Sequence, residues 1–137
     1  MSEYEIDDNP TRIDVNAVWA YLSTDAYWGQ WRTREQFEAQ LAGAWRVAGV
    51  YHRATGTQVG FARALSDGVG TAYLADVFVL ESARGHGLGK ALVRAMVEEG
   101  AGARFRWMLH TRDAHALYEG FGFGAPDAMY MERPAQM

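Results

Sequence analysis

The chain has 137 residues, of which 49% are apolar and 22% charged, with a net charge of −4 and no cysteine. Its length and composition are ordinary for one globular unit, so we expect a single domain over residues 1–137. The acidic balance argues against nucleic acid as a partner, and the lack of cysteine excludes disulfides and cysteine nucleophiles within this sequence. No signal peptide, membrane span or membrane partner is expected, which favours a cytoplasmic protein.

The first third of the chain predicts one strand, two helices and an aromatic loop. Asp14 is placed to cap the first helix, and Thr33 with Gln36 resembles a capping box ahead of the second. In chain order we expect a strand at Tyr4–Ile6, a helix at Asp14–Leu22, a loop at Ser23–Arg34 and a helix at Arg34–Leu41.

From Trp45 onward the apolar pattern predicts mostly strands. In chain order we expect strands at Trp45–Tyr51, Gln58–Leu65 and Thr71–Leu80, a helix at Leu88–Glu99, a strand at Arg104–His110, a short helix at Asp113–Glu119 capped by Asp113, and final strands at Phe121–Phe123 and Met129–Met131. The first three of these strands predict an antiparallel meander, because short turns join them. The whole order is typical of a mixed α/β (α+β) domain.

A glycine-rich segment between a predicted strand and a predicted helix is the most informative feature for function. Arg84-Gly85-His86-Gly87-Leu88-Gly89 follows the strand that ends near Leu80 and leads directly into a helical pattern. Glycines leave backbone N–H groups accessible, and the first turn of a helix carries unpaired N–H groups at the positive end of its dipole. The segment therefore predicts a site for a phosphate-bearing ligand.

Two segments together resemble the GNAT superfamily of acyl-CoA-dependent N-acetyltransferases. The segment Arg84–Gly89 matches the family fingerprint Gln/Arg-x-x-Gly-x-Gly/Ala, and the segment Leu117–Phe123 resembles the family's Leu-Tyr-x-x-x-Gly-Phe. The predicted order of elements is also similar over roughly the whole chain. The resemblance implies a GNAT-like fold, with a central, mostly antiparallel sheet whose middle strands splay apart and whose faces are flanked by helices. It also implies acetyl-CoA as the acyl donor.

The resemblance assigns the acetyl-CoA contacts to three places. The pyrophosphate is expected on the backbone of Arg84–Gly89, and the pantetheine arm is expected to pair like an added strand with Val77, Phe78 and Val79. Thr111 stands where many family members have an asparagine that contacts the pantetheine. Its hydroxyl can still form a hydrogen bond, so Thr111 is included among the cofactor residues.

The resemblance also suggests two catalytic residues. A tyrosine at the place of Tyr118 lies near the cofactor sulfur in the family and can protonate the leaving thiolate. Asp76 lies on the strand from which many members supply a carboxylate that deprotonates the amine. Simple strand alternation puts Ala75 and Asp76 on opposite faces, so two alternatives stay open for Asp76, a general base or a structural hydrogen-bond acceptor.

Three aromatic residues in the loop that covers the acceptor site of the family are expected to contact the acceptor. They are Tyr27, Trp28 and Trp31, and packing in the core is the alternative for each. Arg63 and Asp67 either line the same cleft or form surface pairs.

The leading functional hypothesis is an N-acetyltransferase that transfers an acetyl group from acetyl-CoA directly to a primary amine of a small molecule. The alternatives are a non-catalytic acyl-CoA-binding or regulatory module, and a nucleotide-binding domain of another fold, which lacks support because no second βα unit is evident. The histidines share no metal-ligand spacing, so no metal site is expected. The identity of the acceptor and the choice between monomer and homodimer stay open.

Overall fold

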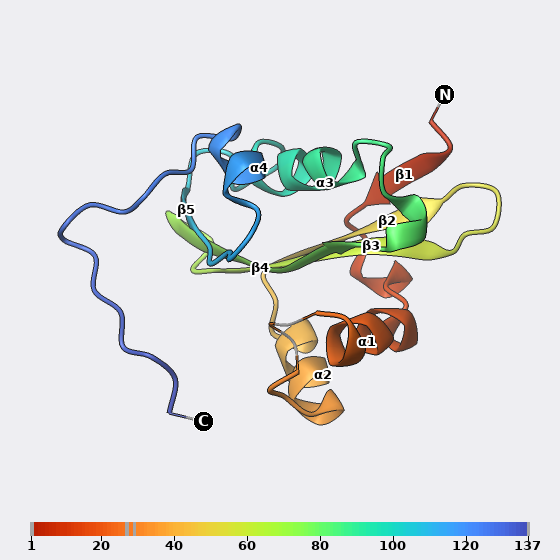
Figure 1. The fold of residues 1–137 in the computed structure, drawn as a ribbon, viewed down its shortest axis with the longest axis horizontal. Coiled ribbons are helices and arrows are strands. Elements are labelled where there is room, and N and C mark those ends of the chain that lie inside the picture. Colours follow the sequence, from red (N-terminus) through yellow and green to blue (C-terminus); the bar gives the residue numbers. More distant parts are fainter. Residues whose placement is uncertain (1, 27, 29, 137) are drawn as a thin grey trace.

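The computed structural model describes residues 2–26, 28 and 30–136. In this part of the chain five strands form one sheet with helices on both of its faces (Figure 1). The elements are β1 (Tyr4–Asp7), the 3₁₀ turn η1 (Pro10–Arg12), α1 (Val15–Thr24), α2 (Arg34–Ala42), β2 (Arg46–His52), β3 (Gln58–Ser66), β4 (Thr71–Val79), the 3₁₀ turn η2 (Glu81–Ala83), α3 (Leu88–Val97), β5 (Arg106–Met108) and α4 (His115–Glu119).

The sheet follows the order of the chain, β1-β2-β3-β4-β5. The strands from β1 to β4 pair antiparallel, which confirms the predicted meander, and β4 pairs with β5 in parallel. The parallel ladder joins only Thr71–Tyr73 to Arg106–Met108. Beyond Tyr73, β4 is no longer paired with β5, so the two strands separate, as expected for the splayed middle strands of this fold.

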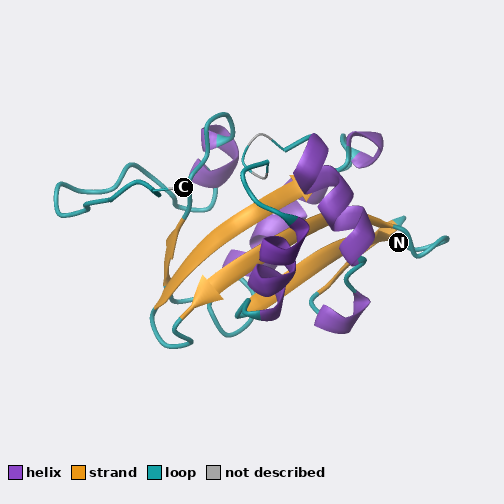
Figure 2. Ribbon diagram, turned by 90° about the horizontal axis from the view of Figure 1, so that it is seen from below, coloured by secondary structure: helices purple, strands orange, loops and turns teal. Residues whose placement is uncertain are grey.

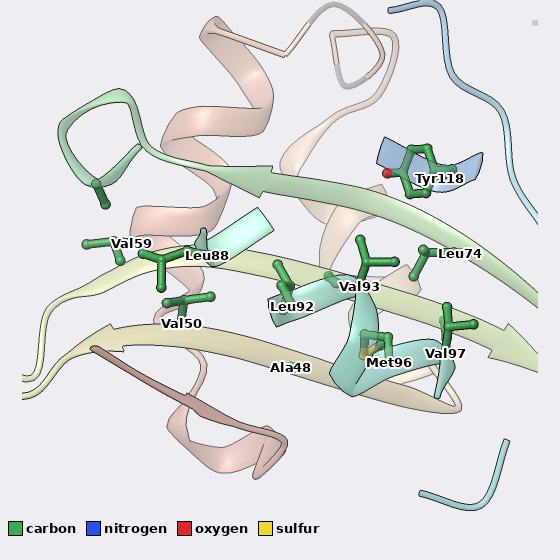
Figure 3. Packing of buried hydrophobic residues seen from close by; sticks show 13 residues of the cluster. Ala48, Val50, Val59, Leu74, Leu88, Leu92, Val93, Met96, Val97 and Tyr118 are labelled. Atoms are coloured by element: carbon green, nitrogen blue, oxygen red, sulfur yellow. The ribbon is translucent and has the colours of Figure 1, made fainter. Parts of the chain in front are cut away.

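Two helical layers cover the sheet, α1 and α2 on one face and α3 and α4 on the other (Figure 1). Figure 3 shows α3 directing apolar side chains such as Leu92 and Met96 toward Ala48 and Val50 of β2. Burial of each such leucine or methionine stabilises the fold by about 1.5–3 kcal/mol. A second core cluster under α1 and α2 includes Phe37, Phe61 and Phe78.

The helix starts in the first half agree with the sequence. The Asp14 side chain accepts a hydrogen bond from the Ala17 backbone at the start of α1. Thr33 and Gln36 form the predicted capping box at the start of α2, because each side chain bonds the backbone of the other residue. The Thr33–Gln36 cap thus lies where the loop that reaches the site enters α2.

A β-bulge in β4 overturns the alternation expected between Ala75 and Asp76. Arg63 of β3 pairs with Ala75 whereas Phe61 pairs with Phe78, so one extra residue of β4 lies between the two pairs. Asp76 has a φ of 57°. Such a left-handed conformation is tolerated by Asp and Asn better than by most other residues. The extra residue puts Ala75 and Asp76 on the same face of the sheet, the face of α1 and α2.

The predictions for the C-terminal region need three corrections. No strand forms at Phe121–Phe123 or Met129–Met131, β5 is shorter than predicted, and Asp113 makes no side-chain cap at α4. Gly122 has a φ of 87°, which interrupts an extended run, and Met129 and Met131 are 84% and 91% exposed. The segment after α4 extends away from the sheet (Figure 2), so its alternating apolar residues do not pair with a neighbouring strand.

In the described ranges no helix is both long and apolar enough to cross a membrane.

Candidate functional site

The separation of β4 from β5 opens a cavity of about 370 Å³. Its walls come from the loop before α2, the middle of β4, and the segment from the end of β5 to α4. The lining residues are Trp28, Leu74, Ala75, Asp76, Val77, Leu109, His110, Thr111, Arg112, Asp113, Ala114 and Tyr118. Thus β4, the loop that precedes α2, and α4 bring together predicted site residues that are far apart in the sequence.

The edge of β4 beyond Tyr73 is open toward this cavity. Among the described residues, the ladder with β5 ends at the pair of Tyr73 and Met108. On its other edge, β4 stays paired with β3 up to Val79. The predicted pantetheine strand Val77–Val79 is therefore held on one side and has no paired strand on the other.

The glycine-rich segment forms a turn that ends at the start of α3. Gly85 and Gly87 have φ values of 88° and 72°, a region that glycine adopts at little cost. Gly87 is the N-cap residue of α3 and no side chain caps the helix there. Apart from adjoining residues of the chain, no heavy atom lies within 4 Å of the place that a Cβ would take at Gly85, Gly87 or Gly89. The segment is therefore an open cradle of backbone N–H groups.

The two side chains of this segment that carry polar groups point to different neighbours. Arg84 donates from Nε to the carbonyl of Val79 at 3.1 Å and from a terminal nitrogen to the hydroxyl of Tyr21 at 3.3 Å. The exposed His86 lies against the ring of Tyr4 at 5.3 Å between centroids. Arg84 thus ties the end of β4 to α1, and the segment approaches a ligand with its backbone.

Asp76 is a buried carboxylate that accepts four hydrogen bonds from three side chains. It is 6% exposed. Arg32 forms a bidentate pair with it at 2.7 and 3.0 Å, and Arg63 donates from Nε at 2.9 Å. The indole N–H of Trp28 donates to Oδ1 at 3.1 Å. These contacts favour the structural alternative for Asp76, because its oxygens are already engaged.

The electrostatics of Asp76 lead to the same conclusion. Burial alone would raise its pKa, but the hydrogen bond from Arg32 and the charge of Arg63 outweigh burial and hold the pKa below its ordinary value. A carboxylate with a lowered pKa is a weak proton acceptor for an ammonium ion. Sequence reasoning missed Arg32, for which no local pattern gives a signal, and Arg63 is found to pair in the interior and not on the surface.

Tyr118 and Thr111 both line the cavity, as the resemblance implied. Tyr118 is 9% exposed on α4, and its ring packs edge-on against Phe123 at 5.8 Å between centroids. The hydroxyl of Thr111 accepts a hydrogen bond from the Ala114 backbone at 3.0 Å. This bond closes the turn just ahead of α4, whose first turn has no side-chain cap.

The predicted acceptor residues have different outcomes. Trp28 lines the cavity, while Trp31 is 51% exposed and does not line it. Tyr27 lies outside the described residues. Asp67 accepts backbone N–H groups within the β3–β4 turn, including that of Val69 at 2.9 Å, and likewise is no part of the cavity wall.

A polar cluster around the cavity residue His110 was not predicted. The hydroxyl of Tyr73 meets Nδ1 of His110, and Nε2 of His110 meets Glu132 at 2.5 Å. Tyr130 donates to the same carboxylate at 2.9 Å. No local pattern signals this cluster, because its members come from β4, the segment after β5 and the C-terminal region. Within the described ranges no group of three or more His, Asp or Glu side chains could hold a metal ion.

The family model of the GNAT acetyltransferases matches residues 15–123, which is most of the chain. The chain belongs to the GNAT acetyltransferase family. A GNAT-family protein from Xanthomonas campestris is 32% identical, with a TM-score of 0.89 over 98% of this chain and 95% of the other. The expected GNAT fold, with a mixed sheet flanked by helices, is therefore confirmed.

More distant GNAT structures share the fold. A GNAT-family acetyltransferase from Streptococcus pneumoniae is 18% identical, with a TM-score of 0.72 over 96% of this chain and 99% of the other. The glucosamine-6-phosphate N-acetyltransferase of Arabidopsis thaliana is 14% identical, with a TM-score of 0.61 over 96% and 99%. No curated protein matches the sequence. These two likenesses show the fold alone, while membership of the GNAT family supports acyl-CoA-dependent acetyl transfer and leaves the acceptor undefined.

Proposed function

We propose that this GNAT protein transfers the acetyl group of acetyl-CoA directly to a primary amine of a small molecule, with both substrates bound at once. The observation that carries the proposal is the open edge of β4 at Val77–Val79, beside a cavity that Tyr118 lines. The cradle at Gly85–Gly89 lies at the end of the same strand and supports a site for a pyrophosphate. A cytoplasmic location is part of the proposal.

The residues present fit acetyl-CoA. Backbone N–H groups of the glycine segment and the first turn of α3 would hold the pyrophosphate, and an added side chain at Gly87 would stand in that space. The β4 edge would bind the pantetheine amides as a neighbouring strand does. When bound, acetyl-CoA supplies an acetyl group activated as a thioester.

The chain's own groups would then assist the transfer. The backbone N–H of Val77 would stabilise the negative charge that develops on the acetyl oxygen as the amine attacks. The hydroxyl of Tyr118 would give a proton to the departing sulfur while the C–S bond breaks and the C–N bond forms. No cysteine is present to carry the acetyl group, which favours direct transfer.

Trp28 and the cavity volume support a small acceptor. The indole of Trp28 is fixed by Asp76 and forms an apolar part of the wall. A cavity of about 370 Å³ lies in the lower part of the range of small-molecule sites. Trp28 would therefore contact the acceptor, and Tyr27 and Trp31 stay predictions from the resemblance.

A substitution of Gly87 tests the acetyl-CoA site. Gly87→Val should weaken acetyl-CoA binding at least about tenfold, because a branched side chain would fill the cradle in front of α3. Isothermal titration calorimetry with acetyl-CoA measures the effect. Gly56→Val is the matched control, since Gly56 has a nearly equal φ of 73° and equally open surroundings in the β2–β3 turn. Equal affinity in both folded variants would contradict the proposed site.

Thiol release separates the enzyme from the alternative of a non-catalytic acyl-CoA-binding module. The wild-type protein should release free coenzyme A from acetyl-CoA faster when a primary amine is added. A protein that binds acetyl-CoA at Gly85–Gly89 but releases no thiol with any amine of a broad panel is a binding module. The tyrosine in the cavity wall favours the enzyme.

A further inference from the structure

The acceptor amine needs a proton acceptor that Asp76 does not supply. An alkyl amine has a pKa near that of a lysine side chain, about 10.4, so at neutral pH it arrives as an ammonium ion without a free lone pair. Asp76 is engaged with Arg32, Arg63 and Trp28. Direct transfer, which is the proposed function on which this inference rests, therefore requires another group near the cavity.

His110 is in the cavity wall and connects to solvent. It lines the cavity at the end of the segment after β5, and its side chain is 62% exposed. A histidine can take up and release a proton near neutral pH, and exposure gives the proton a route to bulk water. Both of its ring nitrogens have hydrogen-bond partners, and these partners select one tautomer of the neutral imidazole.

The partners of His110 select one tautomer. Hydrogen bonds from Tyr130 and then His110 hold the pKa of Glu132 below its ordinary value, so Glu132 is an ionised carboxylate that can only accept. Nε2 of His110 must therefore carry the hydrogen that Glu132 receives. In the neutral imidazole Nδ1 then holds the lone pair, which accepts the hydroxyl hydrogen of Tyr73.

Tyr73 is placed to pass a proton to this lone pair. Burial, followed by the negative charge of Glu132, raises the pKa of Tyr73, so its hydroxyl stays protonated. Tyr73 pairs with Leu65 and Ala75 pairs with Arg63, so Tyr73 and the cavity residue Ala75 point to the same face of the sheet. That is the face on which Trp28 contacts Asp76.

We propose that Tyr73, His110 and Glu132 form a proton relay that deprotonates the acceptor amine. One N–H bond of the ammonium ion breaks as an O–H bond forms at Tyr73. The original hydroxyl proton of Tyr73 passes to Nδ1 of His110, and the imidazolium ion is stabilised by Glu132. The net change is one proton moved from the amine to His110, which then returns it to solvent.

Kinetics with substituted relay residues test the proposal. Tyr73→Phe and His110→Gln should each lower kcat/KM for the amine about 100-fold, within the usual range for general base catalysis. The double variant should lose little more than either single variant, because both residues serve one step. The probes are acetyl-CoA with 2-phenylethylamine and with spermidine, and calorimetry should show unchanged acetyl-CoA affinity.

His52→Gln is the matched control. His52 contacts a hydroxyl, that of Thr55, and a carboxylate, that of Glu3, each at 3.2 Å, and it lies on β2 outside the cavity. This variant should keep wild-type rates. Full activity in His110→Gln beside an active wild type would overturn the relay alone. A wild type that binds acetyl-CoA and acetylates neither of these amines nor any other amine of the panel would overturn the proposed function together with the relay.

Two further measurements distinguish a relay from a merely structural cluster. In the wild type, kcat/KM should fall at acid pH with the uptake of one proton, and His110→Gln should lack this limb. The ionisable groups in contact with His110 are Tyr73 and Glu132, and Tyr130 bonds the Glu132 carboxylate. The other ionisable groups that line the same cavity are Asp76, Arg112, Asp113 and Tyr118. Nitrogen-15 NMR of labelled histidine, which needs no acceptor, should show His110 protonated at Nε2 at neutral pH. Protonation at Nδ1 alone would overturn the proposal.

Discussion

Tyr118 is a buried phenol whose position depends on packing as much as on its hydroxyl. It belongs to the core cluster that α3 forms with the sheet, and Figure 3 shows it on α4 among the side chains of that cluster. Its ring contacts Phe123 of the segment that follows α4. Removal of the hydroxyl alone should therefore leave the ring and the cavity wall in place.

Tyr118→Phe should lower kcat about 10²- to 10⁴-fold, because the sulfur would leave without a proton donor. The affinity for acetyl-CoA should change little, since the interaction with the hydroxyl forms only in the transition state. Steady-state kinetics and calorimetry measure the two quantities. Tyr51→Phe is the control, because Tyr51 is another buried tyrosine, and its hydroxyl has no hydrogen-bond partner in the described part of the chain. Full turnover in Tyr118→Phe would remove Tyr118 from the mechanism.

At the scale of elements, four residues of β4 line the cavity, and a bulge that the sequence did not predict sets their orientation. Its apolar run predicted a strand, and the meander followed from the short turns on either side of β3. The bulge at Asp76 could not be predicted, because it arises from the offset between the pairs Arg63–Ala75 and Phe61–Phe78. Simple alternation therefore gave the wrong face for Asp76 relative to Ala75.

The close approach of β2, β3 and β4 depends on a glycine in the middle strand. A Cβ at Gly60 would lie 2.9 Å from a methyl group of Val50 and 3.0 Å from the carbonyl oxygen of Phe78. Gly60→Ala should lower the free energy of unfolding by about 1–3 kcal/mol, because the backbone of β4 cannot move without losing pairs. Urea unfolding measures it. Gly70→Ala, where an added Cβ meets nothing within 4 Å, should be near neutral, and equal stability of the two variants would contradict this account.

For the whole molecule, local signals predicted most of the elements and the glycine turn before α3, while the cavity wall depends on contacts between distant segments. The glycine segment and the capping box are short patterns that have a direct physical meaning. Arg32 is 44 residues from Asp76, and His110 is 22 residues from Glu132. No periodicity links such pairs. The last two strands were wrong for the same reason, since a strand requires a neighbouring edge as well as an alternating sequence.

Asp76 of β4 pairs with Arg32 of the loop before α2 and with Arg63 of β3. Because these pairs join three segments, the negative charge of Asp76 should affect the stability of the whole fold. Asp76→Asn keeps the side-chain shape and tolerates the positive φ, but it leaves Arg32 and Arg63 buried without a counter-charge. We expect a loss of about 3–5 kcal/mol in the free energy of unfolding at pH 7.

The pH dependence of this loss follows from the lowered pKa of Asp76 in the folded state. The stabilising contribution is present above the ordinary aspartate pKa of about 4, and it is lost as the pH falls through the lower folded value. Urea unfolding from pH 7 to pH 3 should therefore show the wild type converging on Asp76→Asn at acid pH. Asp25→Asn, at an exposed position after α1, should track the wild type throughout. A wild-type advantage over Asp76→Asn that stays constant down to pH 3 would show that the carboxylate charge does not hold these three segments together.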